Sequence, residues 1–294
     1  MKKCIITTIL LITLMVPLSG CILTDGNTVT LGSRNNTESI ILSHVMGRLI
    51  EEKTDIKVQY RENLGGSNVV WNALMNDSIQ VIPDYTGTIV TSYYQKEPGD
   101  AKETLNMTRD LVSKDGLVAL EPFGFNNTYT LALDESIAEE HDIHTFSDFS
   151  EISKDFTLGA VFEFIDRPDG LPGFKKEYNI DFKKVKGMDH GMMYRAIGND
   201  EVDVINSYTT DGQLQVYDLR VLEDDKSFFP PYHALPMVRE DTLEEYPELK
   251  DVLNELADEI DEETIQVMNG KVDNDGEHVE KVAEEFLKEN GFMK

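Results

Sequence analysis

The chain has 294 residues, of which 55 are acidic and 27 basic, and its formal net charge at pH 7 is −28. A surface of this sign repels nucleic acid and anionic lipid, so we expect no nucleic-acid partner. A cationic ligand or a high-salt habitat suits it better, and acidic residues spread over the whole chain favour the habitat. The only cysteines are Cys4 and Cys21, which excludes disulfides, thiol catalysis and cysteine metal sites beyond residue 21.

The N-terminus has the pattern of an export signal. Two lysines precede an apolar stretch at 5–18, and Leu-Ser-Gly-Cys follows, ending at Cys21. About 14 apolar residues are too few to span a bilayer, which needs roughly 20. The Leu-Ser-Gly-Cys ending resembles the lipobox of lipoproteins. We therefore predict a signal peptide at 1–20, lipidation of Cys21, and a lipid-anchored stalk at 21–27 that holds the protein on the outer face of the cell membrane.

Strand and helix patterns alternate along the first part of the chain. The predicted elements are a strand at 29–32, a helix from Asn36 or Thr37 to 50, a strand at 56–60, a turn with an N-cap at 65–67, and a helix at 69–75. A further set of strand patterns begins at 128–133 and continues at 158–161 and 202–205. This alternation predicts βαβ units, a largely parallel sheet and two α/β lobes.

The last part of the chain becomes helical and acidic after Pro230-Pro231. Residues 240–263 contain twelve carboxylates and one lysine. Apolar side chains nevertheless recur at helical spacing, at Leu249, Leu253, Leu256 and Ile260. This pattern predicts an amphipathic helix with a solvated acidic face rather than an acidic tail.

Four tyrosines share one local setting, in which an apolar run meets small polar or turn residues. They are Tyr85, Tyr129, Tyr208 and Tyr232. Junctions between strands and loops present side chains to ligands. Several ring faces that converge on one point hold a permanently methylated ammonium group by cation–π attraction. The alternative is structural, because tyrosine is also common at half-buried strand ends.

Six motifs, in this order along the chain, resemble the substrate-binding proteins of glycine betaine, choline and carnitine ABC importers. They are Leu31-Gly32-Ser33-Arg34-Asn35-Asn36-Thr37-Glu38-Ser39, Pro83-Asp84-Tyr85-Thr86-Gly87-Thr88, Asn126-Asn127-Thr128-Tyr129, Glu163-Phe164 with Arg167-Pro168-Asp169-Gly170, Asp203-Val204-Ile205-Asn206-Ser207-Tyr208-Thr209-Thr210-Asp211-Gly212, and Phe229-Pro230-Pro231-Tyr232. They extend from about residue 29 to the C-terminus, so the resemblance covers essentially the whole chain after the signal peptide.

The resemblance implies a two-lobed periplasmic-binding-protein fold of type II, in which the chain crosses twice between lobes and the ligand lies in the cleft. The implied divisions are 28–127 for the first part of lobe I, 128–231 for lobe II, and 232–294 for the second part of lobe I.

The resemblance also implies roles for eight residues. Tyr85, Tyr129, Tyr208 and Tyr232 become the walls of an aromatic cage. Arg34, Thr88 and Arg167 are assigned to the polar tail of the ligand, where an arginine fork fits a carboxylate. Asn127 becomes the floor of the cage. Some relatives carry an acid at this position, so the neutral amide removes one countercharge from the cage.

The predicted function is that of a lipid-anchored, extracytoplasmic binding protein that captures a quaternary-ammonium osmoprotectant and delivers it to an ABC permease. We expect a monomer, no cofactor, no metal and no catalysis, because no nucleophile–base pair or metal-ligand set is visible. His141 and His144, for example, lack a third ligand. The alternatives are the same fold binding another cationic or zwitterionic solute, and a cell-surface sensor or enzyme that reuses the cleft.

Overall fold

The structure of the protein is a computed structural model that describes residues 26–294. The predicted signal peptide and Cys21 lie outside the described residues. The strands are β1 (Thr28–Gly32), β2 (Lys57–Arg61), β3 (Val81–Tyr85), β4 (Leu117–Ala119), β5 (Tyr129–Asp134), β6 (Thr157–Val161), β7 (Lys184–Met188), β8 (Val204–Tyr208), β9 (Leu219–Val221) and β10 (Ala234–Arg239).

Helices connect and cover these strands. The α-helices are α1 (Thr37–Lys53), α2 (Ser67–Met75), α3 (Thr86–Thr88), α4 (Ala101–Val112), α5 (Glu135–His141), α6 (Phe146–Ser150), α7 (Phe162–Asp166), α8 (Leu171–Tyr178), α9 (His190–Gly198), α10 (Glu240–Glu245), α11 (Glu248–Asn254), α12 (Glu262–Asp273) and α13 (Val279–Glu289). A π-helical segment, η1 (Ile89–Tyr93), and a 3₁₀ segment, η4 (Gly212–Gln215), adjoin the site described below. Between residues 26 and 294, none of the helices combines the length and the hydropathy that crossing a bilayer requires.

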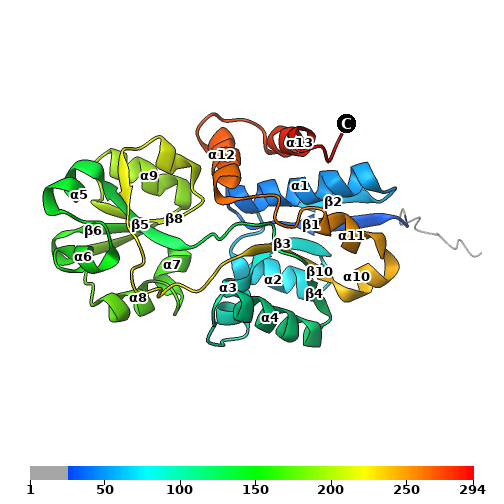
Figure 1. The fold of residues 1–294 in the computed structure, drawn as a ribbon, viewed down its shortest axis with the longest axis horizontal. Helices are drawn as coiled ribbons and strands as arrows, with labels where there is room; N and C mark the ends of the chain where they lie inside the picture. Colours follow the sequence, from blue (N-terminus) through cyan, green and yellow to red (C-terminus); the bar gives the residue numbers. More distant parts are fainter. Residues whose placement is uncertain (1–25) are drawn as a thin grey trace, which may run out of the picture.

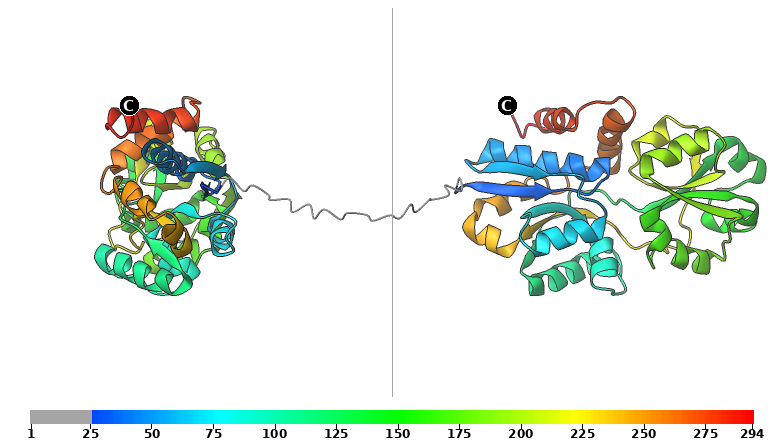
Figure 2. Two further views of the ribbon diagram at one scale, coloured as in Figure 1. Left: turned by 90° about the vertical axis from the view of Figure 1, so that its right-hand side faces the viewer. Right: turned by 180° about the vertical axis from the view of Figure 1, so that it is seen from behind.

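The strands form two five-stranded sheets, in the orders β2-β1-β3-β10-β4 and β7-β6-β8-β5-β9. We call the parts of the protein built on these sheets lobe I and lobe II (Figure 1). The chain passes from lobe I to lobe II between β4 and β5, and it returns between β9 and β10. Figure 2 shows both crossing segments from behind. The predicted fold class is confirmed, whereas the division at residues 127 and 231 stays a prediction.

Each sheet contains one strand that arrives from the other lobe, and this strand runs antiparallel to both of its neighbours. In lobe I the arriving strand is β10, between β3 and β4, and in lobe II it is β5, between β8 and β9. The remaining pairings, β1 with β2 and β3 and β6 with β7 and β8, are parallel. The expectation of largely parallel sheets was therefore wrong, because half of the strand pairings are antiparallel.

This topology places at the gap between the lobes the strand ends at which α/β sheets bind ligands. Parallel strands in each lobe run toward the other lobe, so their carboxyl ends face the gap, whereas an arriving antiparallel strand starts there. Open α/β sheets bind ligands at such carboxyl ends. In lobe I, α1 packs on one face with β1 and Val81, while Ile82 and Met237 belong to a separate core with α2. This alternation follows from the period of two along a strand.

Two local predictions differ from the structure. Residues 240–263 do not form one helix. The helix α10 ends before Tyr246-Pro247, because a residue before proline is disfavoured in helical geometry, and Asp258 takes a left-handed φ of 58°. At 65–67, Gly66 occupies the N-cap position of α2 without a side-chain cap. The Ser67 hydroxyl instead donates to Glu163 Oε1 across the lobes, at 2.6 Å.

Candidate functional site

A cavity of about 570 Å³ lies between the lobes, and all eight residues predicted for the ligand line it. They are Arg34, Tyr85, Thr88, Asn127, Tyr129, Arg167, Tyr208 and Tyr232. They come from both lobes and from the crossing segments. The cavity is within the usual size range of small-molecule sites.

Strand pairing explains the positions of the four tyrosines. Tyr85 is the last residue of β3, and the start of its antiparallel partner β10 lies two residues after Tyr232. Tyr208 is the last residue of β8 and pairs directly with Tyr129, the first residue of β5. Each lobe therefore contributes one tyrosine from the end of a parallel strand and one from the start of, or just before, an arriving strand.

The ring of Tyr129 contacts two of the other three rings. The centroid of the Tyr129 ring lies 5.0 Å from that of Tyr208 and 5.7 Å from that of Tyr232, in tilted and edge-on arrangements. Phe164 and Phe229 pack behind Tyr129, with centroids at 5.0 and 5.5 Å. We call Tyr129, Tyr208 and Tyr232 the three-ring cluster. Ring faces held in place by such packing are preorganised to attract a cation.

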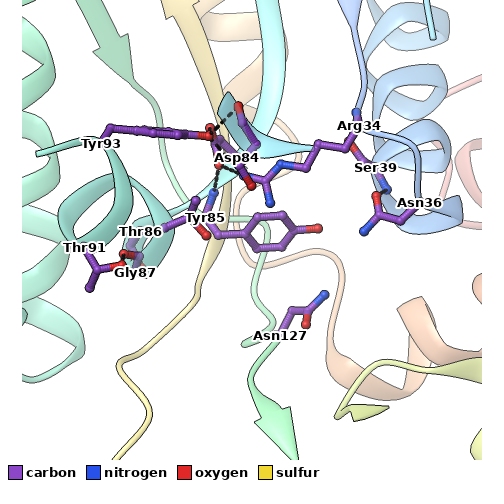
Figure 3. Close-up of polar contacts among 12 residues, drawn as sticks. Arg34, Asn36, Ser39, Asp84, Tyr85, Thr86, Gly87, Thr91, Tyr93 and Asn127 are labelled. Carbon is purple, nitrogen blue, oxygen red and sulfur yellow. Dashed lines mark hydrogen bonds and ion pairs between the residues drawn. The ribbon is translucent and has the colours of Figure 1, made fainter. Parts of the chain in front are cut away.

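Tyr85 stands apart from the three-ring cluster and is fixed by polar contacts. Its backbone N–H bonds the Asp84 carboxylate at 2.8 Å, and its hydroxyl donates to Glu38. The Arg34 guanidinium lies over its ring, 5.0 Å from the centroid. Figure 3 shows the ring of Tyr85 projecting between Arg34 and Asn127.

Arg34 forms a buried ion pair with Asp84, a residue to which the sequence analysis assigned no role. Arg34 Nη2 contacts Asp84 Oδ1, and the second carboxylate oxygen accepts a 3.1 Å bond from the Tyr93 hydroxyl (Figure 3). Asp84 is fully buried and Arg34 is 8% exposed. Arg34 Nε is buried without a partner. The guanidinium therefore retains a donor that its ion pair does not use.

Arg167 is held more completely, by two acids of its own lobe. Its Nε donates to Asp169 Oδ1 at 2.8 Å, its Nη2 contacts Asp169 Oδ2, and its Nη1 lies 3.2 Å from Glu163 Oε1. Nη1 is also 3.5 Å from the Thr88 hydroxyl of lobe I. The planar fork is thus occupied by Asp169 in bidentate geometry.

Hydrogen bonds join the lobes around the cavity. Besides the Ser67–Glu163 bond, the Thr91 hydroxyl donates to Asp169 Oδ2 at 2.7 Å. Asn269 Nδ2, from α12, donates to the Thr210 carbonyl of lobe II at 2.9 Å. In Figure 1, α12 lies beside the gap between the lobes. The lobes are therefore in direct contact around the cavity.

Two groups of functional residues were missed by the sequence analysis. His190 bonds Asp211, Nε2 to Oδ1, at 2.9 Å, and Asp211 also accepts from the Tyr194 hydroxyl and from the backbone N–H of Tyr208. Asp211 thereby positions Tyr208, one of the tyrosines predicted for the cage. Burial alone would lower the pKa of His190, but the Asp211 carboxylate outweighs this and raises it.

The second missed group is Glu38 with Asn269. Glu38 belongs to the first motif, but the sequence analysis assigned it no role. It is 4% exposed and lines the cavity. Asn127 Nδ2 donates to Glu38 Oε1 at 2.7 Å, and Asn269 Nδ2 lies 3.2 Å from Oε2. The sequence did contain a signal for Glu38, because it is an acidic residue in the first turn of a predicted helix and lies within a family motif.

The acids around Arg167 predict a pH dependence of stability. Burial alone would raise the pKa values of Glu163 and Asp169, but the nearby arginine charge holds both below their ordinary range. A carboxylate whose pKa is lowered by folding stabilises the folded state at pH values above its unfolded-state pKa, which is near 4. This stabilisation is lost as the pH falls through the pKa of the folded state. We expect Asp169→Asn to be less stable than the wild type at pH 7, with the difference shrinking below about pH 4.

Urea unfolding from pH 7 to pH 3 measures this difference. Asp181→Asn is the control, because Asp181 forms an exposed pair with Lys175 at 2.7 Å, which salt screens. Adding about 0.5 M salt, roughly three times the physiological ionic strength, should remove the stability difference caused by Asp181→Asn. Most of the stability difference caused by Asp169→Asn should remain. A pH-independent Asp169 difference would contradict the assignment.

Two α/β lobes with two crossings and a shared, tyrosine-lined cavity define a solute-binding protein of the type II periplasmic-binding-protein fold. A solved structure described as a glycine betaine/carnitine/choline ABC transporter is 36% identical, covers 90% of this chain and 100% of its own, and has a TM-score of 0.77.

Sequence comparison identifies the family. Residues 27–289 match the substrate binding domain of ABC-type glycine betaine transport systems. The carnitine transport binding protein OpuCC of Listeria monocytogenes is 33% identical over 304 positions, covering 100% of this chain and 99% of the relative. A glycine-betaine-binding protein of Pseudomonas aeruginosa is 32% identical over 283 positions, covering 92% and 90%.

The chain belongs to this family of substrate-binding proteins, as the sequence motifs predicted. Its relatives are transport proteins rather than enzymes, and substrate-binding proteins of ABC importers work outside the cytoplasm together with a permease.

Proposed function

We propose that this protein captures glycine betaine or a related quaternary-ammonium osmoprotectant, namely carnitine, choline or proline betaine, and delivers it to its permease. The observation that carries this proposal is that Tyr85 and the three-ring cluster line the same cavity. A trimethylammonium group has no N–H to donate, so hydrogen-bond acceptors do not recognise it specifically. Tyrosine faces supply quadrupole attraction and apolar contact for its methyl groups.

The polar tail of the ligand is assigned to Arg34, Thr88 and Arg167. Arg34 offers its unpartnered Nε. Thr88, a residue that is 2% exposed, offers its hydroxyl. Arg167 is bound bidentately by Asp169, so it supplies positive charge and a shared edge rather than a free fork. A carboxylate at this end of the cavity is compatible with all three. Asn127 forms the floor of the cage.

The export features belong to the same proposal. Lipidation of Cys21 after removal of residues 1–20 anchors the domain to the outer face of the cell membrane through the stalk at 21–27. The protein acts there as a monomer whose lobes are 28–127 with 232–294, and 128–231.

A second candidate is another, larger cationic or zwitterionic solute. The volume of the cavity, about 570 Å³, favours it, because this space exceeds what a molecule as small as glycine betaine fills. The same titration panel distinguishes the two candidates.

The test is calorimetric titration with glycine betaine, carnitine, choline and glycine. We expect saturable binding of at least one trimethylammonium compound with a dissociation constant on the order of micromolar, or about 8 kcal/mol. Glycine, which lacks the methyl groups, should not bind comparably. Equal affinity for glycine and glycine betaine would show that the rings do not form a methylammonium cage.

A further inference from the structure

Glu38 is a buried acid of the cavity wall to which the proposed function assigns no role. Its carboxylate accepts from the Tyr85 hydroxyl, Asn127 Nδ2 and Asn269 Nδ2. All three of these partners are neutral. Tyr85 belongs to the cage, Asn127 lies on the crossing segment before β5, and Asn269 lies on α12. Glu38 therefore gathers three separate parts of the chain around one negative group.

Glu38 differs from the other buried or half-buried acids around the cavity, which have cationic partners. Within residues 26–294, Asp189 and Asp273 also line the cavity without an ion pair, but both are exposed. The ion pairs of these buried or half-buried acids are Asp84 with Arg34, Glu163 and Asp169 with Arg167, and Asp211 with His190. A buried carboxylate without a cation is costly unless it is protonated or meets a charge later. Burial raises the pKa of Glu38, while its hydrogen bonds to Thr210 and its other partners oppose this.

The two amides beside Glu38 add further acceptors. Both amide nitrogens face the Glu38 carboxylate, and Asn269 Nδ2 also faces the Thr210 carbonyl. Rotating either amide would bring its oxygen against an oxygen, so the hydrogen bonds determine which atom is nitrogen. Asn127 Oδ1 and Asn269 Oδ1 are then buried without partners in residues that line the cavity. This wall carries one carboxylate and two unused acceptors.

We infer that Glu38, supported by Asn127 and Asn269, is the counter-charge for the cationic head of the ligand. This inference rests on the proposed function and assigns one negative pole to the cage. Arg34, at the other side of Tyr85, lies toward the positive pole, so the cavity complements a zwitterion. The hydrogen bond from the Tyr85 hydroxyl to an anion also polarises the ring toward greater electron density, which strengthens cation–π attraction.

Glu38 thereby replaces the countercharge that the neutral amide of Asn127 does not supply. The permanent charge of the ligand, rather than its shape alone, becomes a criterion of selection. A neutral compound of the same shape leaves Glu38 without a cation and should bind poorly.

The experiment compares Glu38→Gln with Glu135→Gln, using glycine betaine and calorimetry at pH 7.5. Glu135 pairs with Arg220 and does not line the cavity, so Glu135→Gln is the charge-matched control. Glu38→Gln removes the charge and keeps the shape. Glu135→Gln removes one negative charge away from the cavity. We expect Glu38→Gln to weaken betaine binding by at least about 30-fold, and Glu135→Gln by less than about twofold.

A second ligand separates charge from packing. In 3,3-dimethylbutanoate a carbon replaces the ammonium nitrogen of glycine betaine, and its affinity is measured by competition. If Glu38 acts through its charge, Glu38→Gln should not weaken the binding of this isostere. The ratio of the isostere affinity to the betaine affinity should rise in this variant.

If Glu38→Gln bound betaine within about threefold of the wild type, the charge of Glu38 would not be used. If Glu38→Gln weakened the isostere as much as betaine, Glu38 would act only by positioning other groups. Either outcome overturns the inference. A wild type that binds none of glycine betaine, carnitine and choline is a different result, because it contradicts the proposed function itself.

Discussion

Replacing Arg34 with Met is expected to lower the free energy of unfolding by about 3–5 kcal/mol, because it leaves a fully buried carboxylate without its cation. Asp84 is 0% exposed and its ion pair is with Arg34. Burial already raises the pKa of Asp84, and Arg34 opposes this. Without Arg34 the carboxyl takes up a proton more readily, so the loss should be largest at neutral pH and smaller in acid. Urea unfolding at pH 7.5 and at pH 5 measures the loss of unfolding free energy at neutral pH and in acid.

The double variant Arg34→Met with Asp84→Asn is the matched control. It removes both charges, and the amide of residue 84 keeps an oxygen for the backbone N–H of Tyr85 and faces the Tyr93 hydroxyl. Most of the stability should return, since replacing both members of a buried pair is often nearly neutral. Affinity for a carboxylate ligand should not return, because Arg34 Nε is absent. A single variant as stable as the wild type would mean that the pair is not formed in solution.

Replacing Tyr129 with Ala is expected to weaken the binding of a quaternary-ammonium ligand by about 100-fold. Each ring of a desolvated cage contributes about 0.5–2 kcal/mol. Tyr129 contributes its own ring and also contacts Tyr208 and Tyr232, whose rings lose their common neighbour. Tyr129→Phe keeps the aromatic face and should stay within about fivefold of the wild type, losing one hydroxyl contact. Calorimetric titration measures both variants.

Tyr217→Ala serves as the control for a lost tyrosine in the same lobe. Its ring packs on Tyr194, with centroids 5.7 Å apart, and it does not line the cavity. The control should lose some thermal stability and keep its affinity. Equal losses of affinity in Tyr129→Ala and Tyr217→Ala would indicate that binding responds to the stability of lobe II rather than to the cage.

The positions of the four tyrosines that line the cavity were readable from the sequence because strand ends are local features. An apolar run that stops at small polar residues marks the end of a strand, and Tyr85 and Tyr208 are the last residues of β3 and β8. The motifs placed Tyr129 and Tyr232 in the same family pattern. Helix α1 was equally local, since Asn36 caps it by accepting from the Ser39 backbone N–H at 3.2 Å.

Other predictions failed where geometry depends on distant partners. The antiparallel direction of β5 and β10 follows from their arrival from the opposite lobe, which no local pattern records. The acidic segment at 240–263 kept its buried leucines but broke into shorter helices. Helical spacing reports which side chains are buried, whereas Pro247 and the left-handed Asp258 decide where the backbone turns.

The sequence by itself determined the family, the two α/β lobes and eight of the residues that line the cavity, because these depend on short patterns along the chain. Only the tertiary structure decided the charges of the site. Asp84 meets an arginine 50 positions away, and Glu38 meets an amide 231 positions away. An ionisable group takes its state from desolvation and from the charges within a few ångströms, and these neighbours exist only after the chain has folded.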